Sequence, residues 1–415
     1  MVQIKAVTAR QILDSRGQPT VETTVILENG IKATASVPSG ASTGIHEAVE
    51  LRDNRAESFG GKSVSLAVEN VRGILNKLLT GLDSTDQQGI DRKMIELDGT
   101  PNKKNIGANA ILSVSAAVLK ASAAAEGKEV YQRISDLYGG KKTEHQVIPL
   151  FNVVNGGLHG NNRLSIQEFM VITAPGLSFS RALETGAAIY QTMRKDLAQR
   201  QIPLAVGDEG GFIPDASDNS QVISYLLEII RQAGYKYGID VFLGLDFASS
   251  TYFKDGYYSF TADTLSSARE YLTEIENLQR QYRFHLLEDP LSEDDWQNWS
   301  VLTEKIGSQT KIVGDDLLVT NSQRLEKAVR EKSCNAILIK INQIGTISET
   351  LEVMHLADKH GFSRIISHRS GETNDDLIAD LAVGTGAQYV KFGAPARGER
   401  TAKYNRLLAI YDQYS

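Results

Sequence analysis

The sequence predicts an α/β protein in which a small N-terminal α+β domain precedes a (β/α)8-type barrel. Three observations carry this prediction. The chain has 415 residues, which is more than one ordinary domain usually holds. Its first third combines a hairpin with helical patterns. Its remainder repeats a short apolar run, a polar residue at the end of the run, and a helical stretch.

The N-terminal domain is expected over residues 1–135. Residues 4–10 and 20–27 have strand character, and the turn Glu28-Asn29-Gly30 predicts a hairpin that leads to a return strand at 31–37. Small residues then run from Pro38 to Gly44 and predict a mobile loop. Helical patterns follow at 64–80, 83–97 and 108–126.

The barrel is expected over residues 140–415, after a glycine- and lysine-containing boundary at 126–146. Apolar runs end in polar residues at 242–246, 284–288, 312–315, 337–340, 365–369 and 389–391, with earlier candidates at 150–154 and 168–172. Continuous apolar strands that alternate with helices predict a parallel sheet covered on both faces. Eight such strands favour a barrel over an open sheet. An Asp255-Gly256 turn in the longest interval predicts an added hairpin.

Composition narrows the class of protein. The net charge of −7 argues against nucleic acid as a main partner, because an acidic surface repels phosphate backbones. Cys334 is the one cysteine, so no internal disulfide can form. The N-terminus lacks an apolar signal stretch, and polar residues interrupt the apolar segment 108–125. We therefore expect a cytoplasmic protein without a membrane span.

Three carboxylates predict a metal site. Asp246, Glu288 and Asp315 each end a separate expected strand, and a barrel directs such residues to one pocket. Converging carboxylates repel one another and need a cation, and oxygen ligands favour magnesium. The alternative is three unrelated acids that cap helices or pair with arginines.

Two lysines stand where strands should be buried. Burial disfavours the charged form of a lysine, so Lys340 could act as a base near neutral pH. The alternative is a lysine that only neutralises a carboxylate. This alternative is plausible for Lys391 and less so for Lys340 and Lys391 together.

Two further clusters are weaker signals. His368-Arg369-Ser370-Gly371 offers a two-pronged guanidinium and a hydroxyl to an anion, although it could equally be a surface turn. The glycine-rich run 206–212 holds Glu209, a possible general acid, with His159 and Glu168 upstream. No P-loop or dinucleotide fingerprint is present in the sequence.

These motifs, taken in order along the whole chain, resemble the enolase family. The matching stretches are 12–17, 37–44, 98–112, 151–159, 167–169, 208–212, 244–246, 287–290, 314–321, 337–345, 367–372 and 402–405. The resemblance implies an α+β capping domain and a modified TIM-like barrel that begins β-β-α-α. It also implies a hydro-lyase of glycolysis and gluconeogenesis that reversibly converts 2-phosphoglycerate to phosphoenolpyruvate with magnesium.

The resemblance assigns a role to each matching residue. Asp246, Glu288 and Asp315 resemble the ligands of a first magnesium ion, and Ser39 resembles a ligand of a second, which binds with substrate. Lys340 resembles the base and Glu209 the general acid, with Glu168 beside it. The expected substrate-binding residues are His159, Gln167, His368, Arg369, Ser370 and Lys391. The family also implies a homodimer or a larger homo-oligomer.

Some positions depart from the usual family pattern and leave alternatives open. They are Gly160-Asn161-Asn162, the segment 247–251, Phe392 and Gly398. The departures favour a divergent paralogue that acts on a phosphonate or another 2-phosphoglycerate analogue. A binding or scaffold role is a further alternative, which the full set of acid, base and metal positions disfavours.

Overall fold

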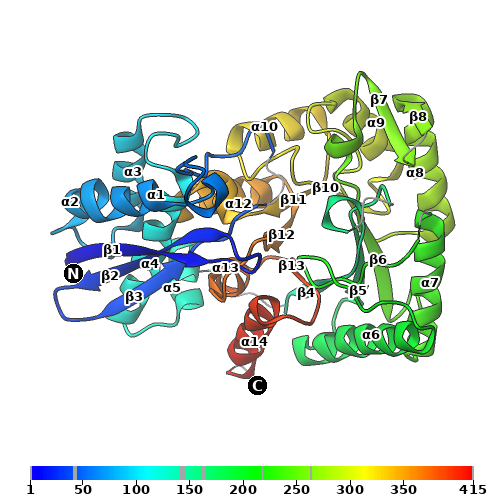
Figure 1. Ribbon diagram of the computed structural model, residues 1–415, viewed down its shortest axis with the longest axis horizontal. Helices are drawn as coiled ribbons and strands as arrows, with labels where there is room; N and C mark the ends of the chain where they lie inside the picture. The colour runs from blue at the N-terminus through cyan, green and yellow to red at the C-terminus, as the bar shows by residue number, and fades with distance from the viewer. Residues whose placement is uncertain are drawn as a thin grey trace.

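A computed structural model of the protein describes residues 2–40, 44–140, 146–160, 164–216, 218–261 and 264–413. An N-terminal sheet with helices stands beside a closed eight-stranded barrel (Figure 1). The predicted fold class, an α+β domain before an α/β barrel, is confirmed.

The N-terminal domain is built on an antiparallel sheet in the order β1-β2-β3. Its strands are β1 (Ile4–Leu13), β2 (Pro19–Leu27) and β3 (Lys32–Ser36). The predicted turn joins β2 to β3, and Gly30 takes the positive φ of 87° that such a turn needs. The helices are η1 (Phe59–Gly61), α1 (Ser65–Asn70), η2 (Val71–Leu75), α2 (Asn76–Leu79), α3 (Gln87–Asp98), α4 (Ala108–Ala125) and α5 (Val130–Leu137). The predicted helix 64–80 is thus one run with a π-helical turn in it.

Helix α4 packs against β2 and β3. Alanine and serine occupy most of its positions, so its backbone lies close to its neighbours on every side, and the Thr23 and Ser113 hydroxyls meet at 2.6 Å. Within the described ranges, α4 is the one helix long and apolar enough to span a membrane, and 83% of it is buried inside the protein. Burial all round is what a core helix without a polar face requires.

The barrel closes in the order β10-β11-β12-β13-β4-β5-β6-β9. Its strands are β4 (Ile148–Asn155), β5 (Glu168–Thr173), β6 (Val241–Asp246), β9 (Leu286–Glu288), β10 (Lys311–Gly314), β11 (Ala336–Ile339), β12 (Ser363–Ser367) and β13 (Tyr389–Gly393). Its interior is filled by apolar side chains, which include Met170, Leu286, Leu338 and Ile365. Functional groups therefore have room only at the ends of the strands.

One strand runs against the rest. β5 is antiparallel to both β4 and β6, so the expectation of a wholly parallel sheet is wrong at this strand. The link between β4 and β5 contains only the short η3 (Gly157–His159) in its described part, whereas a parallel return usually needs a crossover helix. The β-β-α-α opening is confirmed by β4, β5, α6 (Phe179–Gln199) and α7 (Asn219–Gln232).

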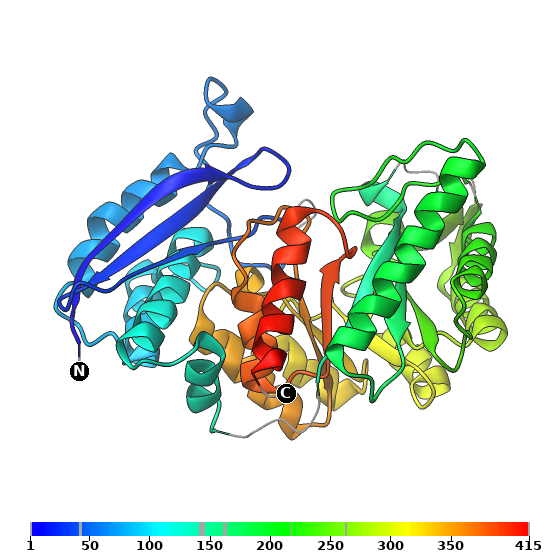
Figure 2. The ribbon, with the colours of Figure 1, turned by 90° about the horizontal axis from the view of Figure 1, so that it is seen from below.

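Helices cover the outside of the barrel. The later ones are η4 (Ser249–Tyr252), α8 (Ala268–Tyr282), α9 (Trp296–Ile306), α10 (Ser322–Glu331), α11 (Ile341–Ile344), α12 (Ile347–Lys359), α13 (Leu377–Thr385) and α14 (Gly398–Asp412). The N-terminal domain lies against the α12–α13 side, and α6 and α7 lie at the far end (Figures 1 and 2). The C-terminal helix α14 stands between them, against α6 and α13 (Figure 2).

The added hairpin differs from its prediction. A tight turn does form at Asp255-Gly256, where Lys254 and Tyr257 exchange backbone hydrogen bonds. The paired strands are β7 (Tyr257–Thr261) and β8 (Thr264–Ser267), so the turn precedes the hairpin and does not join its strands. The residues before the turn form η4 instead of a strand.

Close packing of α6 on β4 gives a test of the fold. A methyl group added at Gly186 would fall on the buried ring of Phe151. We expect Gly186→Ala to lower the free energy of unfolding by about 1–3 kcal/mol. Gly73→Ala, at a helical glycine with open space around it, should raise it by about 0.5–1 kcal/mol. Urea unfolding measures both, and equal effects would contradict this packing.

Candidate active site

The carboxyl ends of the barrel strands surround a polar cavity of about 30 Å3. Polar side chains from different segments lie within hydrogen-bond or ion-pair distance of one another around it. The predicted site residues that line it are His159, Gln167, Glu168, Glu209, Asp246, Asp315, Lys340, His368, Arg369, Ser370 and Lys391. Of the predicted set, Glu288 and Ser39 do not line it.

Strand register brings three carboxylates together. Glu168 pairs with Asp246 across β5 and β6, and Asp246 pairs with Glu288 across β6 and β9. All three are nearly completely buried. Because they lie on adjacent strands at one level of the barrel, their negative charges must share a counter-ion.

Lys391 is that counter-ion in this structure. Its Nζ lies 2.8 Å from Glu168 Oε2, 2.8 Å from each carboxylate oxygen of Glu288 and 3.2 Å from Asp246 Oδ2. Burial opposes the charge of Lys391, but the three carboxylates outweigh it and raise the lysine pKa well above its ordinary value. Burial and the neighbouring Asp246 raise the pKa of Glu288 to about 8. A lysine that neutralises carboxylates, one of the two alternatives for this position, is what the geometry presents.

Lys340 makes a second buried pair, with Asp315. Its Nζ donates a short hydrogen bond to Asp315 Oδ2, and Gln343 Nε2 donates to Oδ1 at 2.9 Å. Burial opposes the lysine charge, yet Asp315 raises the pKa of Lys340 above its ordinary value. Pairing with Asp315 favours the charged form of Lys340, which cannot accept a proton. A cation that took over Asp315 would remove this stabilisation and add a repulsive charge.

A histidine–glutamate group forms the other side of the cavity. His159 Nδ1 lies 3.4 Å from Glu209 Oε1 and 3.7 Å from Glu168 Oε1, and His368 Nε2 lies 3.6 Å from Glu209 Oε1. Asn152 Nδ2 donates to Glu209 Oε2 at 2.5 Å.

The two glutamates differ in their affinity for a proton. Burial and the charge of Glu209 raise the pKa of Glu168 well above its ordinary value. Burial would also raise the pKa of Glu209, but His159 and then His368 and Lys391 hold it well below that value. Like charges this close do not both ionise readily, so Glu168 has the higher affinity for a proton of the two. The proposed general acid Glu209 would have to gain a proton before it could donate one.

The donor set fits a hard divalent cation. Among the described residues, two groups have ligand atoms within 4.8 Å of one another: His159, Glu168 and Glu209, and Asp289, Asp315 and Asp316. Asp246 and Glu288 are joined through Lys391 instead. All of the carboxylates expected to bind magnesium are buried and offer oxygen alone, which is the chemistry magnesium prefers.

Asp289 and Asp316 were missed by sequence reasoning. Both line the cavity, and each directly follows a predicted ligand, so the doubled acids Glu288-Asp289 and Asp315-Asp316 were an available signal. The Asp289 carboxylate accepts the backbone N–H groups of Asp315 at 2.9 Å and Asp316 at 2.8 Å. Asp289 thus fixes the turn that presents Asp315, and its own φ of 39° shows that the strand end is strained.

Ser39 belongs to a clasp between the domains. It pairs with Gly371 through two backbone hydrogen bonds of 2.8 and 2.9 Å. Its hydroxyl accepts from Arg16 at 3.1 Å and Arg52 at 2.9 Å, and donates to Glu50 at 3.2 Å. Residues 41–43 of the predicted mobile loop lie outside the described residues, as do Asn161 and Asn162. The role of Ser39 as a metal ligand stays a prediction.

The anion-binding candidates are buried and already paired. Arg369 donates to Glu47 Oε2 at 2.9 Å, and Gln167 Nε2 lies 3.5 Å from Asp246 Oδ2. The run 368–371 is thus not the surface turn that was one reading of the sequence.

Metal binding at Glu288 should be coupled to protons. Its raised pKa of about 8 means that the free site holds a proton at neutral pH, whereas magnesium needs the carboxylate. Binding should release this proton, so affinity should rise by up to about tenfold per pH unit between about pH 6 and pH 8, and then level off. Isothermal titration in two buffers of different ionisation enthalpy measures the release. A flat affinity with no proton released would contradict the assignment.

Comparison with known families bears on the whole chain. The family model described as "Enolase, N-terminal domain" matches residues 4–134, and the one described as "Enolase, C-terminal TIM barrel domain" matches residues 144–415. The two matches fall on the three-stranded sheet with its helices and on the closed barrel respectively. With both halves matched in order, the chain belongs to the enolase family.

Proposed function

We propose that the protein is a magnesium-dependent hydro-lyase that reversibly dehydrates 2-phosphoglycerate to phosphoenolpyruvate. The observation that carries this proposal is the placement of Lys340 and Glu168. They stand at the ends of β11 and β5, which lie four places apart in a ring of eight strands, on opposite sides of one cavity. A base on one face and an acid on the other suit the removal of a proton and a hydroxide from adjacent carbons.

The two sides of the cavity divide the reaction between them. Lys340 would take the proton from C2, and the Glu168–Glu209 pair, with its shared proton, would protonate the leaving hydroxide at C3. Arg369 and Ser370 supply a fork and a hydroxyl for the phosphoryl group. Asp246, Glu288 and Asp315 would hold magnesium, which supplies positive charge beside the substrate carboxylate as its negative charge grows.

The charge of Lys340 supports the same assignment. Its pKa is raised by Asp315, so the lysine becomes a base only when another cation takes that carboxylate. Substrate deprotonation would then require a cation bound at Asp315. Without that cation, Lys340 would stay paired with Asp315.

Family membership further supports a cytoplasmic place in glycolysis and gluconeogenesis, and a homodimer or larger homo-oligomer. It also supports a second magnesium ion near Ser39 and domains that span 1–135 and 140–415.

A second substrate deserves a direct comparison. Ala248 and Thr251 line the cavity and belong to a segment that departs from the usual family pattern. Ala248 also adopts a positive φ of 44°. These residues favour the alternative of a phosphonate or another 2-phosphoglycerate analogue as substrate.

The substrate assay separates these two readings. With magnesium, 2-phosphoglycerate should give an ultraviolet-absorbing enol product, and chelation should abolish it. The phosphonate analogue should be turned over with a lower kcat/KM. A higher kcat/KM for the analogue would replace the proposed substrate, and no product from either compound would overturn the proposal.

Proton exchange tests the roles of base and acid. Lys340→Ala should lower kcat by about 10²–10⁴-fold and stop exchange of the C2 proton with solvent deuterium. Glu209→Gln should also stop dehydration but leave C2 exchange running, because its step follows proton removal. NMR of recovered substrate measures exchange. Continued exchange in the lysine variant would exclude Lys340 as the base.

A further inference from the structure

Arg400 is a buried cation that none of the roles above uses. It lies in the first turns of α14, and its side chain is completely buried. A buried guanidinium is costly unless its N–H groups are hydrogen-bonded, so the partners of this side chain show what it holds in place.

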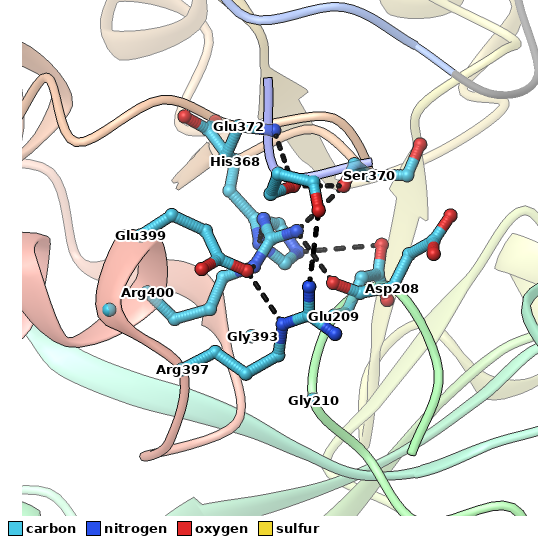
Figure 3. A network of polar contacts seen from close by, with 12 residues as sticks. Asp208, Glu209, Gly210, His368, Ser370, Glu372, Gly393, Arg397, Glu399 and Arg400 are labelled. Atoms are coloured by element: carbon cyan, nitrogen blue, oxygen red, sulfur yellow. Dashed lines mark hydrogen bonds and ion pairs between the residues drawn. The ribbon is translucent and has the colours of Figure 1, made fainter. Parts of the chain in front are cut away.

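The four hydrogen-bond acceptors of the Arg400 side chain belong to two segments of the candidate site, and its Nε lies 3.5 Å from the Glu399 carboxylate. Nη1 lies 2.7 Å from His368 Nδ1 and donates to the Arg369 carbonyl at 2.6 Å. Nη2 donates to the carbonyls of Asp208 at 2.9 Å and Ser370 at 2.7 Å. Figure 3 shows the guanidinium between the segment that carries Glu209 and the segment that carries His368.

The contact with His368 fixes where that histidine carries its proton. A guanidinium has only donors, so His368 Nδ1 must be the acceptor of this hydrogen bond. The proton of the neutral ring is then on Nε2, because the hydrogen bond at one ring nitrogen determines the state of the other. Nε2 is buried and makes no hydrogen bond among the described residues. It lies 3.6 Å from Glu209 Oε1.

Packing leaves this arrangement little freedom. Gly393, at the end of β13, has a φ of 90°, and a methyl group there would lie 2.7 Å from the Glu209 carbonyl oxygen and 3.0 Å from both Arg400 Cδ and His368 Cε1. Ala394 N–H donates to the Glu209 carbonyl at 2.9 Å. The backbone of β13 therefore packs against the side chains of Arg400 and His368 and against the Glu209 carbonyl, which restricts movement of the guanidinium away from His368.

We propose that Arg400 is a positioning residue for the acid side of the reaction: it holds His368 as the Nε2–H tautomer directed at Glu209, and it fixes the Asp208–Glu209 segment relative to the His368–Ser370 segment. This inference rests on the proposed function for its consequence in catalysis, but its structural content does not. Arg400 does not line the cavity, so it would act through His368 and the Asp208–Glu209 segment. Its four side-chain hydrogen bonds go to neither Lys340 nor Asp315.

The tautomer can be measured in the unaltered protein without substrate. Long-range 1H–15N spectra of [15N]histidine-labelled protein report the protonation of each ring nitrogen, and the signals of His368 are those lost in His368→Gln. We expect a protonated Nε2 and an unprotonated Nδ1 at neutral pH. An Nδ1–H or doubly protonated ring would overturn the inference, whatever reaction the protein catalyses.

A matched pair of variants tests the effect on catalysis. Arg400→Gln should lower kcat by about 10–100-fold while C2 proton exchange continues at saturating substrate, because the acid step loses its support. The KM should rise as well, because Arg400 also holds the carbonyls of Arg369 and Ser370. The control is Arg364→Gln. Arg364 is also buried and donates to two backbone carbonyls, but it lies at the start of β12, whereas the His368–Ser370 segment held by Arg400 follows the other end of that strand. It should lose stability and keep kcat.

The outcomes separate the inference from the proposed function. Loss of dehydration with retained C2 exchange in Arg400→Gln, and mixed His368 tautomers in its spectra, would support positioning. Equal losses of kcat and exchange in Arg400→Gln and Arg364→Gln would reduce Arg400 to a stabilising residue and overturn the inference. If neither 2-phosphoglycerate nor its analogue reacts with the unaltered protein, the proposed function fails and the tautomer spectra alone decide the structural claim.

Discussion

Buried charge governs this structure more than any other constraint. Barrel closure sets Glu168, Asp246 and Glu288 side by side below solvent, and only a cation among them makes this tolerable. Lys391 on β13 is that cation. Lys340, which follows β11, neutralises Asp315, which follows the neighbouring strand β10. These ion pairs lie around the cavity and occupy part of the space at the strand ends. Under the proposed function, an incoming metal ion would take the place of these lysines beside the carboxylates.

The N-terminal domain is tied to the site by contacts with the loops of the barrel. Ser39 is paired with Gly371, Ser15 with Glu372, and Glu47 with Arg369, so the loops of the first domain cover the mouth of the barrel. Arg397 reaches back from the C-terminal segment to the Ser15 carbonyl at 3.3 Å. Residues of both domains form this surface, so the contact between the domains is part of the site.

Much of the fold was readable because its signals are local. An apolar run followed by one polar residue, as at 337–340, marks both a buried strand and the end that faces the pocket. The direction of β5 was not readable from its own residues, since it depends on the link that precedes it. The hairpin was misplaced for a similar reason: a tight turn at Asp255-Gly256 looks the same whether or not strands flank it.

The site was readable only in part. Lys340 and its carboxylates stand at strand ends, but the state of Lys340 is decided by Asp315, which is distant in sequence. Arg400 lies in a charged segment, Arg397 to Arg400, of the kind that normally faces solvent. Its complete burial results from the packing of α14 on the barrel, and no sequence pattern within the helix predicts it.

The position of β13 has a consequence for folding during synthesis on the ribosome. β13 closes the barrel by pairing with β4, whose residues are made far earlier. At ordinary translation rates, about 10–50 s separate the synthesis of Ile148 from that of Tyr389. Glu168, Asp246 and Glu288 emerge from the ribosome during that interval, before the lysine that neutralises them. Until β13, the last strand of the barrel, has been made, these carboxylates lack Lys391, and we expect them to stay solvated.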